Sequence, residues 1–210
     1  MRILFAFFTT LLVSGTVLPA LAQDQATPPA ETAPPAATPP EATPPPPAPT
    51  KQGRLDQLFA DLKRERNEKA AERIAGRIWN EWNQSGSASI DLMMQWAQKA
   101  MEDQKFDVAL DFLDQVVTLQ PDYAEGWNRR ATAHFMMKNY GKSMADIDRT
   151  LQLEPRHFGA LSGLAQIMAE TGHKQSALEA WQKVLSIYPM MRSAQNQVST
   201  LSEELAGEGI

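Results

Sequence analysis

A proline recurs at a fixed interval in the second half of the sequence. Pro121, Pro155 and Pro189 lie 34 residues apart, and each follows an apolar run, in VVTLQP, RTLQLEP and VLSIYP. Because proline lacks an N–H and clashes with the preceding helical turn, each run is expected to end as a helix at its proline. An interval between 20 and 50 residues is typical of a repeated structural unit. The sequence therefore predicts a repeat of 34 residues, with a proline at each link between units.

Bulky and small residues alternate in the same order within each unit. When the proline is numbered 32, the units begin at Ile90, Ala124 and Phe158. Position 4 then holds Met93, Trp127 and Leu161, and position 8 holds Ala97, Ala131 and Ala165. Position 20 holds Ala109, Ser143 and Ala177, and position 24 holds Leu113, Ile147 and Trp181. This spacing predicts apolar stripes on two helices that approach closely at the small residues. Short polar turns at 102–106, 138–142 and 170–174 predict that the two helices form antiparallel hairpins.

The period and the columns resemble the tetratricopeptide repeat (TPR) family. Residues 124–157 match best, and residues 90–123 and 158–191 match well. The resemblance implies an all-α fold, a right-handed superhelical stack of antiparallel helical hairpins (a TPR α-solenoid) with three clear repeats. The residues that define the repeats, and are expected to pack, are Trp127, Ala131, Tyr140, Pro121, Pro155, Pro189, Ala177 and Trp181.

Weaker matches flank the three repeats. Residues 54–89 read as a degenerate hairpin, because Lys63 replaces the small residue of position 8 and Ser87 replaces the proline. Trp79 and Trp82 are expected to plug the open end of the stack. Residues 192–210 are polar with a sparse apolar stripe, which predicts a capping helix followed by a frayed tail, AGEGI.

The N-terminal quarter of the chain is not expected to join the fold. Residues 1–22 combine Arg2, an apolar stretch and a final Ala-Leu-Ala, which predicts a signal peptide cleaved before Gln23. The stretch is shorter than the ~20 residues of a membrane span, so no stable membrane anchor is expected after cleavage. Residues 23–53 are rich in Pro, Ala and Thr, which predicts a disordered linker. This linker acts either as a spacer or as a ligand for a proline-recognising partner.

Composition excludes several classes of function. The chain has no cysteine, so it has no disulfide, thiolate metal site or cysteine nucleophile. Its net charge of −5 and its pI near 5.3 argue against nucleic-acid binding. The histidines form no metal-ligand motif, and we expect no catalytic residue, metal or cofactor. The acid pairs Asp111/Asp114 and Asp146/Asp148 are expected to be solvated on polar helix faces.

The resemblance also implies a concave groove lined by positions 2, 5, 9, 12 and 13 of each repeat. The candidate groove residues are Met94, Gln98, Met101, Asn128, Thr132, Phe135, Ser162 and Gln166. Family members that clamp a peptide carboxylate place Lys or Arg at positions 5 and 9, and this sequence has none there. Amides, hydroxyls and methionines predict instead a permissive groove for an extended or helical segment of another protein. The alternative is that these side chains only pack hairpin against hairpin.

Two arginines depart from the repeat pattern at Arg129 and Arg130. Arg130 stands at position 7, where the neighbouring repeats carry apolar residues. A buried guanidinium without a partner is costly, so we expect Arg130 to pair with a nearby acid or to lay its stem along apolar surface. His134 occupies a bulky core column and is expected to pack, whereas His157 and His173 fall in interhelical turns.

The sequence resembles exported TPR proteins of Gram-negative bacteria with a Pro-rich N-terminal spacer, through WNRRATAHF and EPRHFGALSGL. We therefore expect a periplasmic protein–protein interaction scaffold of the cell envelope. One alternative is a self-assembling structural module, which would pair as a homodimer through its repeat ends or its concave face. Another is an accessory subunit of an envelope enzyme machine.

Overall fold

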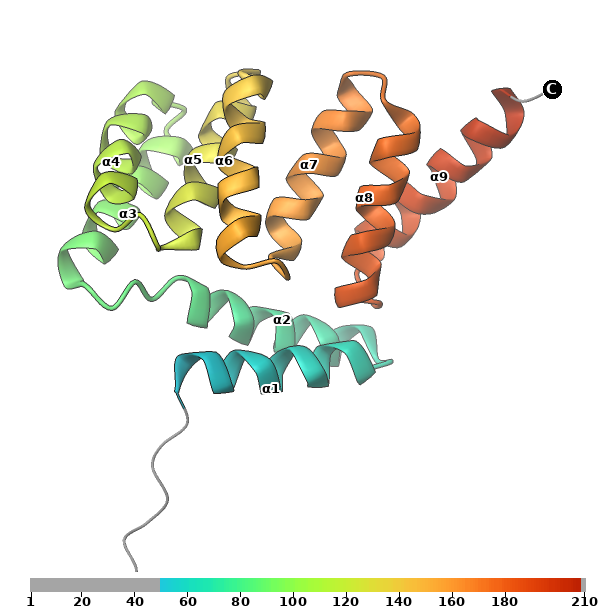
Figure 1. Cartoon of the computed structure of the whole chain (residues 1–210), viewed down its shortest axis with the longest axis horizontal. Coiled ribbons are helices and arrows are strands. Elements are labelled where there is room, and N and C mark those ends of the chain that lie inside the picture. The colour runs from blue at the N-terminus through green and yellow to red at the C-terminus, as the bar shows by residue number, and fades with distance from the viewer. Residues whose placement is uncertain (1–49, 209–210) are drawn as a thin grey trace, which may run out of the picture. The chain divides into compact units, whose positions relative to one another are not determined.

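A computed structural model describes residues 50–208 of the chain. Within this range all regular structure is helical, as the sequence predicts (Figure 1). The helices are α1 Lys51–Arg64, α2 Glu68–Trp82, α3 Ala88–Glu102, α4 Phe106–Leu119, α5 Ala124–Met136, α6 Tyr140–Leu153, α7 Phe158–Glu170, α8 Lys174–Ile187 and α9 Arg192–Glu208. None of these helices is long and apolar enough to span a bilayer.

The predicted signal peptide and most of the predicted linker lie outside the described residues. Where the described part begins, the structure corrects the linker boundary. Helix α1 starts at Lys51 rather than after residue 53, because the Thr50 hydroxyl accepts a hydrogen bond from the Gly53 N–H (3.1 Å) and caps the helix. Helix α9 also continues to Glu208, into the stretch 206–210 that the sequence predicts to fray; residues 209 and 210 lie outside the described residues.

The three central hairpins stack in chain order, which confirms the predicted all-α stack. They are α3–α4, α5–α6 and α7–α8, and consecutive hairpins meet where α4 packs on α5 and α6 packs on α7. The small residues expected at the close approaches are buried, with Ala131 at 3% exposure and Ala177 at 0%. Helix α9 packs against α8 and buries Ala194 and Leu201 in the same core.

The 34-residue period extends to the backbone of the turns. Gln104, Lys138 and Gly172 occupy equivalent positions and all have positive φ, at 58°, 58° and 80°. The residue after each one donates its N–H to a carbonyl in the last turn of the preceding helix, at 2.8 Å in all three repeats. This left-handed turn is a standard helix ending, and only the third repeat fills it with the glycine that it favours.

The prolines act as the sequence predicts. Helices α4, α6 and α8 each end two residues before a proline, and the intervening residues Gln120, Glu154 and Tyr188 have extended or near-extended backbone. A residue before proline is pushed out of the helical region, which accounts for this repeated stop. The side chain six residues later then fixes the link: Trp127 Nε1 donates to the Pro121 carbonyl (3.0 Å), and Gln195 Nε2 donates to the Pro189 carbonyl (2.8 Å).

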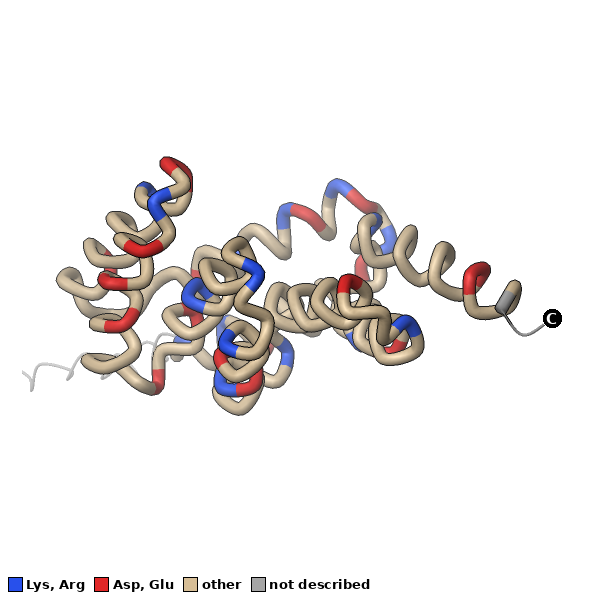
Figure 2. The backbone as a smooth tube through the Cα atoms, turned by 90° about the horizontal axis from the view of Figure 1, so that it is seen from above, with Lys and Arg blue, Asp and Glu red and all other residues tan. Residues whose placement is uncertain are grey.

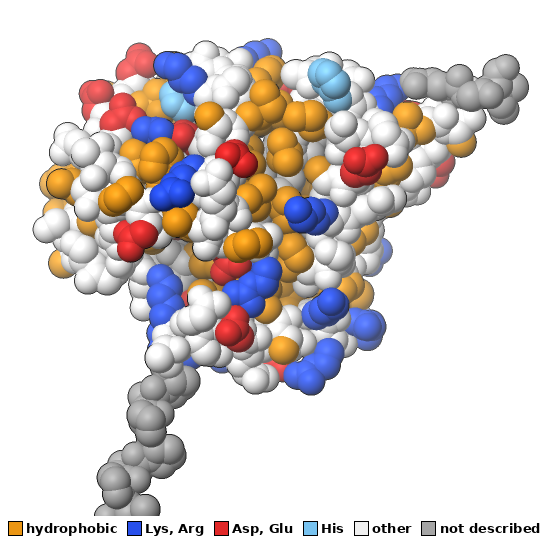
Figure 3. Space-filling view, in the orientation of Figure 1, with side chains coloured by type: hydrophobic (Ala, Val, Ile, Leu, Met, Phe, Trp, Pro, Cys, Tyr) orange, Lys and Arg blue, Asp and Glu red, His pale blue; other side chains and the backbone are white. Residues whose placement is uncertain are grey.

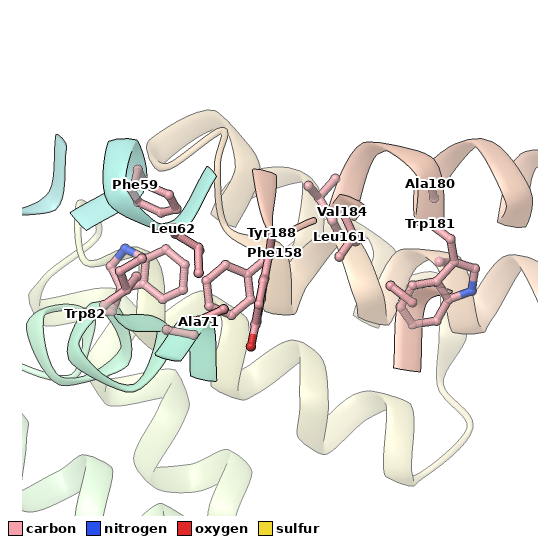
Figure 4. Close-up of a cluster of buried hydrophobic side chains, with 14 of the residues drawn as sticks. Phe59, Leu62, Ala71, Trp82, Phe158, Leu161, Ala180, Trp181, Val184 and Tyr188 are labelled. Carbon is pink, nitrogen blue, oxygen red and sulfur yellow. The ribbon is translucent and has the colours of Figure 1, made fainter. Parts of the chain in front are cut away.

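The N-terminal hairpin does not stack on the first repeat, so the prediction that Trp79 and Trp82 plug that end is wrong. Helices α1 and α2 instead lie across the ends of α7 and α8 (Figure 1). The Phe158 ring lies 5.5 Å from the Trp79 ring and 5.0 Å from the Trp82 ring. Figure 4 shows Phe158 and Trp82 together in the cluster. Ion pairs at the rim join Asp56 to Arg156 and Glu68 to Arg192, both at 2.8 Å.

The N-terminal hairpin lies here because the first residues of α7 and the residue before it form a surface that packs against aromatic rings, which we call the seat. His157 and Phe158 offer ring faces, and Gly159 leaves room for the Trp79 indole, since a Cβ at residue 159 would lie 2.7 Å from the ring. Phe59 and Leu62 of α1 pack on the cluster from the opposite side, and Tyr188, the residue that follows α8, also packs in it. Burial of these large rings accounts for the packing of α1 and α2 on α7 and α8.

This docking predicts opposite effects for two alanine substitutions in α7. Gly159→Ala should lower the free energy of unfolding by about 1–3 kcal/mol, because the new methyl group displaces Trp79. Gly163→Ala, one turn later, meets only Ile147 at 3.5 Å and should be neutral or stabilising. Urea denaturation followed by circular dichroism measures both, and hydrogen exchange should show the loss of protection concentrated in α1 and α2. If the two substitutions changed the free energy of unfolding equally, the packing of Trp79 against Gly159 would be contradicted.

Candidate functional site

Three hollows follow one another along the first helices of the repeats. The first, of about 530 Å³, lies between α3 and α5; the second, of about 150 Å³, lies between α5 and α7; the third, of about 300 Å³, lies between α7 and α9. The second and third share Ser162 and Gln166 of α7. We call these three hollows the inner groove. Figure 3 shows hydrophobic side chains reaching the surface between the helices, among charged groups of both signs.

The inner groove brings together seven of the eight predicted groove residues. Met94 and Gln98 line the first hollow, Asn128, Thr132 and Phe135 line the second, and Ser162 and Gln166 line the second and third. Met101 does not line the groove. Its side chain is half-buried against the core of the first repeat, so for this residue the packing alternative is correct.

Sequence reasoning missed several lining residues. Position 6 of the repeat also faces the groove, and it supplies Gln95, Arg129 and Gly163. This column could have been found, because positions 2, 5, 6 and 9 share one helix face. The repeat pattern could not have identified Asn83 and Gln197 as lining residues. Asn83 directly follows α2 and Gln197 lies in α9, both outside the three repeats.

Much of the polar lining is already hydrogen-bonded within the chain. The Thr132 hydroxyl donates to the Asn128 carbonyl (2.9 Å), and the Ser162 hydroxyl donates to the Phe158 carbonyl (2.7 Å). Asn128 Nδ2 donates to Glu125 (2.9 Å). These groups therefore present mainly oxygen lone pairs to the groove. Three other lining amides, Gln95, Gln166 and Gln197, make no side-chain hydrogen bond within the described part of the chain.

A buried polar cluster lies beneath the middle of the groove. Glu125, in the first turn of α5, is 1% exposed and accepts hydrogen bonds from Asn128, Arg129 and His157. The Arg129 contact is 2.8 Å and the His157 contact 3.1 Å. Arg129 continues across the first hollow to the side-chain oxygens of Gln98 and Asn83. We call Glu125, Asn128, Arg129 and His157 the Glu125 cluster.

His157 lies in the turn between α6 and α7, where the sequence places it, and is a structural part of this cluster. It precedes α7, is fully buried, and its Nδ1 accepts the Ala160 N–H at 3.1 Å, which caps the helix. Because Nδ1 is the acceptor, Nε2 carries the proton that points to Glu125. The Trp82 indole stacks on the imidazole, with centroids 4.0 Å apart and planes 9° apart. One side chain therefore joins α2, α5 and α7 beneath the groove.

The cluster keeps a buried carboxylate charged. Burial by itself raises the pKa of Glu125, but the hydrogen bonds from His157 and Arg129 and the charge of Arg129 outweigh it, so the pKa lies below the usual 4.5. The Arg129 charge is correspondingly neutralised by Glu125 and is not a free anion site. The groove therefore carries an arginine without being basic, and the backbone tube shows both charge signs interspersed along the helices (Figure 2).

Arg130 behaves as predicted, and its partner corrects another expectation. Its guanidinium bonds to Asp146 (2.8 and 2.7 Å) and to Asp114 (2.8 Å), and it lies 4.8 Å from the Trp127 ring. Asp146 is therefore not solvated on a polar face; it is 4% exposed. His134 is also buried, and burial lowers its pKa. Within the described residues, no group of three or more His, Asp or Glu side chains could hold a metal ion.

The Glu125 cluster predicts an acid-sensitive contribution to stability. The folded-state pKa lies below the unfolded value, so this contribution is fully present above about pH 5 and is lost as the pH falls through the folded-state pKa. Glu125→Gln should cost about 1.5–3 kcal/mol at pH 7, because a charged hydrogen-bond acceptor is lost. The difference from the unmodified protein should shrink at pH 3, as measured by urea denaturation at each pH. Glu72→Gln, at an exposed carboxylate, is the control and should change stability little. If the loss of stability caused by Glu125→Gln were the same at pH 7 and pH 3, the Glu125 carboxylate would not be charged in the folded protein.

Comparisons with known proteins are consistent in fold and family. No family model matches the chain. A TPR repeat-containing protein of Rhizobium etli is 58% identical over 154 residues, which cover 73% of this chain and 76% of that protein. Small glutamine-rich tetratricopeptide repeat-containing protein 2 of Saccharomyces cerevisiae is 31% identical over 97 residues, or 46% of this chain, but only 28% of the yeast protein is spanned.

Solved structures agree with this fold at low sequence identity. The first TPR of Spaghetti (RPAP3), bound to an HSP90 peptide, is 20% identical with a TM-score of 0.53; it covers 56% of this chain and 93% of the solved chain. The Sgt2 TPR domain of Aspergillus fumigatus is 17% identical with a TM-score of 0.55; it covers 59% of this chain and 83% of the solved chain. MamA is 20% identical with a TM-score of 0.53, covering 66% and 81%. Together with the Rhizobium relative, the stacked hairpins and their 34-residue period show that this chain belongs to the tetratricopeptide repeat family.

Proposed function

We propose that the chain is a protein–protein interaction scaffold that binds a peptide segment or helix of a partner protein in the inner groove. The observation that carries the proposal is the run of three hollows along α3, α5, α7 and α9, of which the second and third share Ser162 and Gln166. A row of hollows of this kind suits an elongated ligand rather than a compact one.

The floor of the middle hollow favours close approach of a polypeptide. Gly159, Ala160 and Gly163 keep it shallow and free of long side chains, while Phe135 and Ile147 supply apolar contact. The lone pairs of Thr132 and Ser162 can accept from backbone N–H groups, and Gln166 can both donate and accept. This combination fits the main chain of an extended segment, with modest apolar side chains directed to Phe135.

The electrostatics favour an uncharged segment. Solved neighbours include the RPAP3 repeat bound to an HSP90 peptide and a yeast Sti1 TPR domain in complex with an Hsp70 peptide. In this chain the arginine of the groove is already paired with Glu125, and the amide of Asn128 is directed to the same carboxylate. A ligand carboxylate would have to compete with a buried internal one, so we propose recognition of main chain and apolar side chains instead.

Site-specific photocrosslinking in the cell that produces the protein tests the groove. A benzophenone amino acid at Thr132 or at Gln166 should give the same partner adduct, because both exposed side chains line the middle hollow. The matched control is Gln182, an exposed glutamine of α8 that lines none of the three hollows. Thr132→Arg should reduce the adduct at Gln166 about tenfold, equivalent to about 1.4 kcal/mol. Equal adducts at Gln166 and Gln182 would show that the groove does not bind the partner.

We further propose that the scaffold works in the bacterial cell envelope, after export to the periplasm. The support is the signal-like composition of residues 1–22 and the Pro-rich character of residues 23–49, which suits a spacer. N-terminal sequencing of the protein from a periplasmic extract should read Gln-Asp-Gln-Ala, beginning at Gln23. Recovery only from the cytoplasm with Met1 or Arg2 as the first residue would rule out export while leaving the groove proposal intact.

A further inference from the structure

The repeat columns identify the face that each hairpin turns toward the hairpin before it. Position 3 is filled by Gly126 and Ala160, both buried; a Cβ at residue 126 would lie 2.8 Å from Val116 of the preceding hairpin. Position 10 is filled by Ala133 and Ile167, both 0% exposed. Arg130, at position 7, reaches back to Asp114 of the preceding hairpin. Positions 3, 7 and 10 are therefore stacking positions.

In the first repeat the same columns face outward; positions 3 and 7 are apolar, and position 10 is Lys99. Leu92 at position 3 is 43% exposed and Trp96 at position 7 is 47% exposed, because the α1–α2 hairpin packs on α7 and α8 instead of here. Val108 and Leu119 of α4 are also exposed, at 44% and 66%. Of the large apolar side chains exposed within the described residues, only Met136 lies elsewhere. We call Leu92, Trp96, Val108, Phe112 and Leu119 the end face.

The end face has the chemistry of half a helix-stacking interface. Trp96 and Phe112 pack against each other at 5.4 Å and stand over a hollow of about 390 Å³. Tryptophan in such a hollow is typical of an interface hot spot. An exposed apolar group of this size on a folded chain marks an interaction surface.

We propose that the end face binds the end face of a second copy of this chain, in a two-fold dimer. The other end of the stack is covered by α9, which packs on α8 with its apolar residues, so a head-to-tail contact is blocked. An isologous pair closes the open end and forms no filament. The contact would place four helices together, with α3 of each copy against α4 of the other.

The charges around the end face suit this self-pairing. Helix α3 carries Lys99 on its exposed stripe, where its ammonium already pairs with Asp103 of the same copy (2.7 Å), and α4 carries Asp111 beside Phe112. When a two-fold axis runs along the hairpin between the helices, α3 of one copy covers α4 of the other, and Trp96 meets Phe112. The same operation sets Lys99 near Asp111 of the second copy, twice. Opposite charges at the rim therefore favour the pair and fix its register.

Sedimentation equilibrium of the full chain over a range of concentrations tests the proposal. The protein should show a monomer–dimer equilibrium, and Trp96→Glu should raise the dissociation constant at least about 30-fold, as expected for a central hot spot. Met136→Glu is the matched control, since Met136 is 55% exposed and lies outside the end face; it should leave the constant unchanged. Circular dichroism at low concentration verifies that each variant is folded.

Two further variants test the register. Lys99→Glu and Asp111→Lys should each weaken the dimer, and the double variant should recover most of the loss, because the charges are exchanged across the interface. The chain has no cysteine, so Gln115→Cys on the exposed stripe of α4 can be joined by a short bismaleimide, which should trap a covalent dimer. Gln197→Cys on α9 should not. A monomer at every concentration, or a dimer unaffected by Trp96→Glu, overturns the proposal.

Discussion

The constraint on which this structure depends is that a pair of helices cannot bury its apolar surface alone. Each hairpin hides one stripe between its own two helices and leaves a second stripe for the next hairpin, so the small residues at the close approaches determine how deeply neighbours interlock. Val116 shows this directly, because it fills the space that Gly126 leaves open in the following repeat. The hollows of the inner groove are what remains between first helices once the second helices have packed.

Periodicity made the central part of the fold predictable from the sequence. The prolines, the alanine columns and the turns recur every 34 residues, so α3 to α8 could be placed, and seven of the eight expected groove residues line the groove. The position of α1 and α2 could not be predicted, because the rings of Trp79 and Trp82 pack on His157 and Phe158, far along the chain and outside any repeated column. Asp146 was misjudged for the same reason: a polar residue is buried when a particular partner satisfies it, and no column records that partner.

The Glu125 cluster connects the unpredicted hairpin to the predicted groove. His157 caps α7 with one nitrogen, holds Glu125 with the other and supports Trp82 on its face. Glu125 in turn directs Asn128 and Arg129 along the groove wall. The shape and the charge of the binding surface are therefore set partly by a hairpin that lies outside the repeats.

The ion pairs that hold α1 and α2 join residues very distant in sequence. Asp56 and Arg156 are 100 positions apart, and Glu68 and Arg192 are 124 apart. An ordinary solenoid has only neighbour-to-neighbour contacts, so it can melt repeat by repeat from either end. Here the start of the described chain is fastened to its last repeat, which couples the unfolding of the C-terminal end to that of the N-terminal hairpin. Such closure raises the contact order, so folding should be slower and more cooperative than in an open array of equal length.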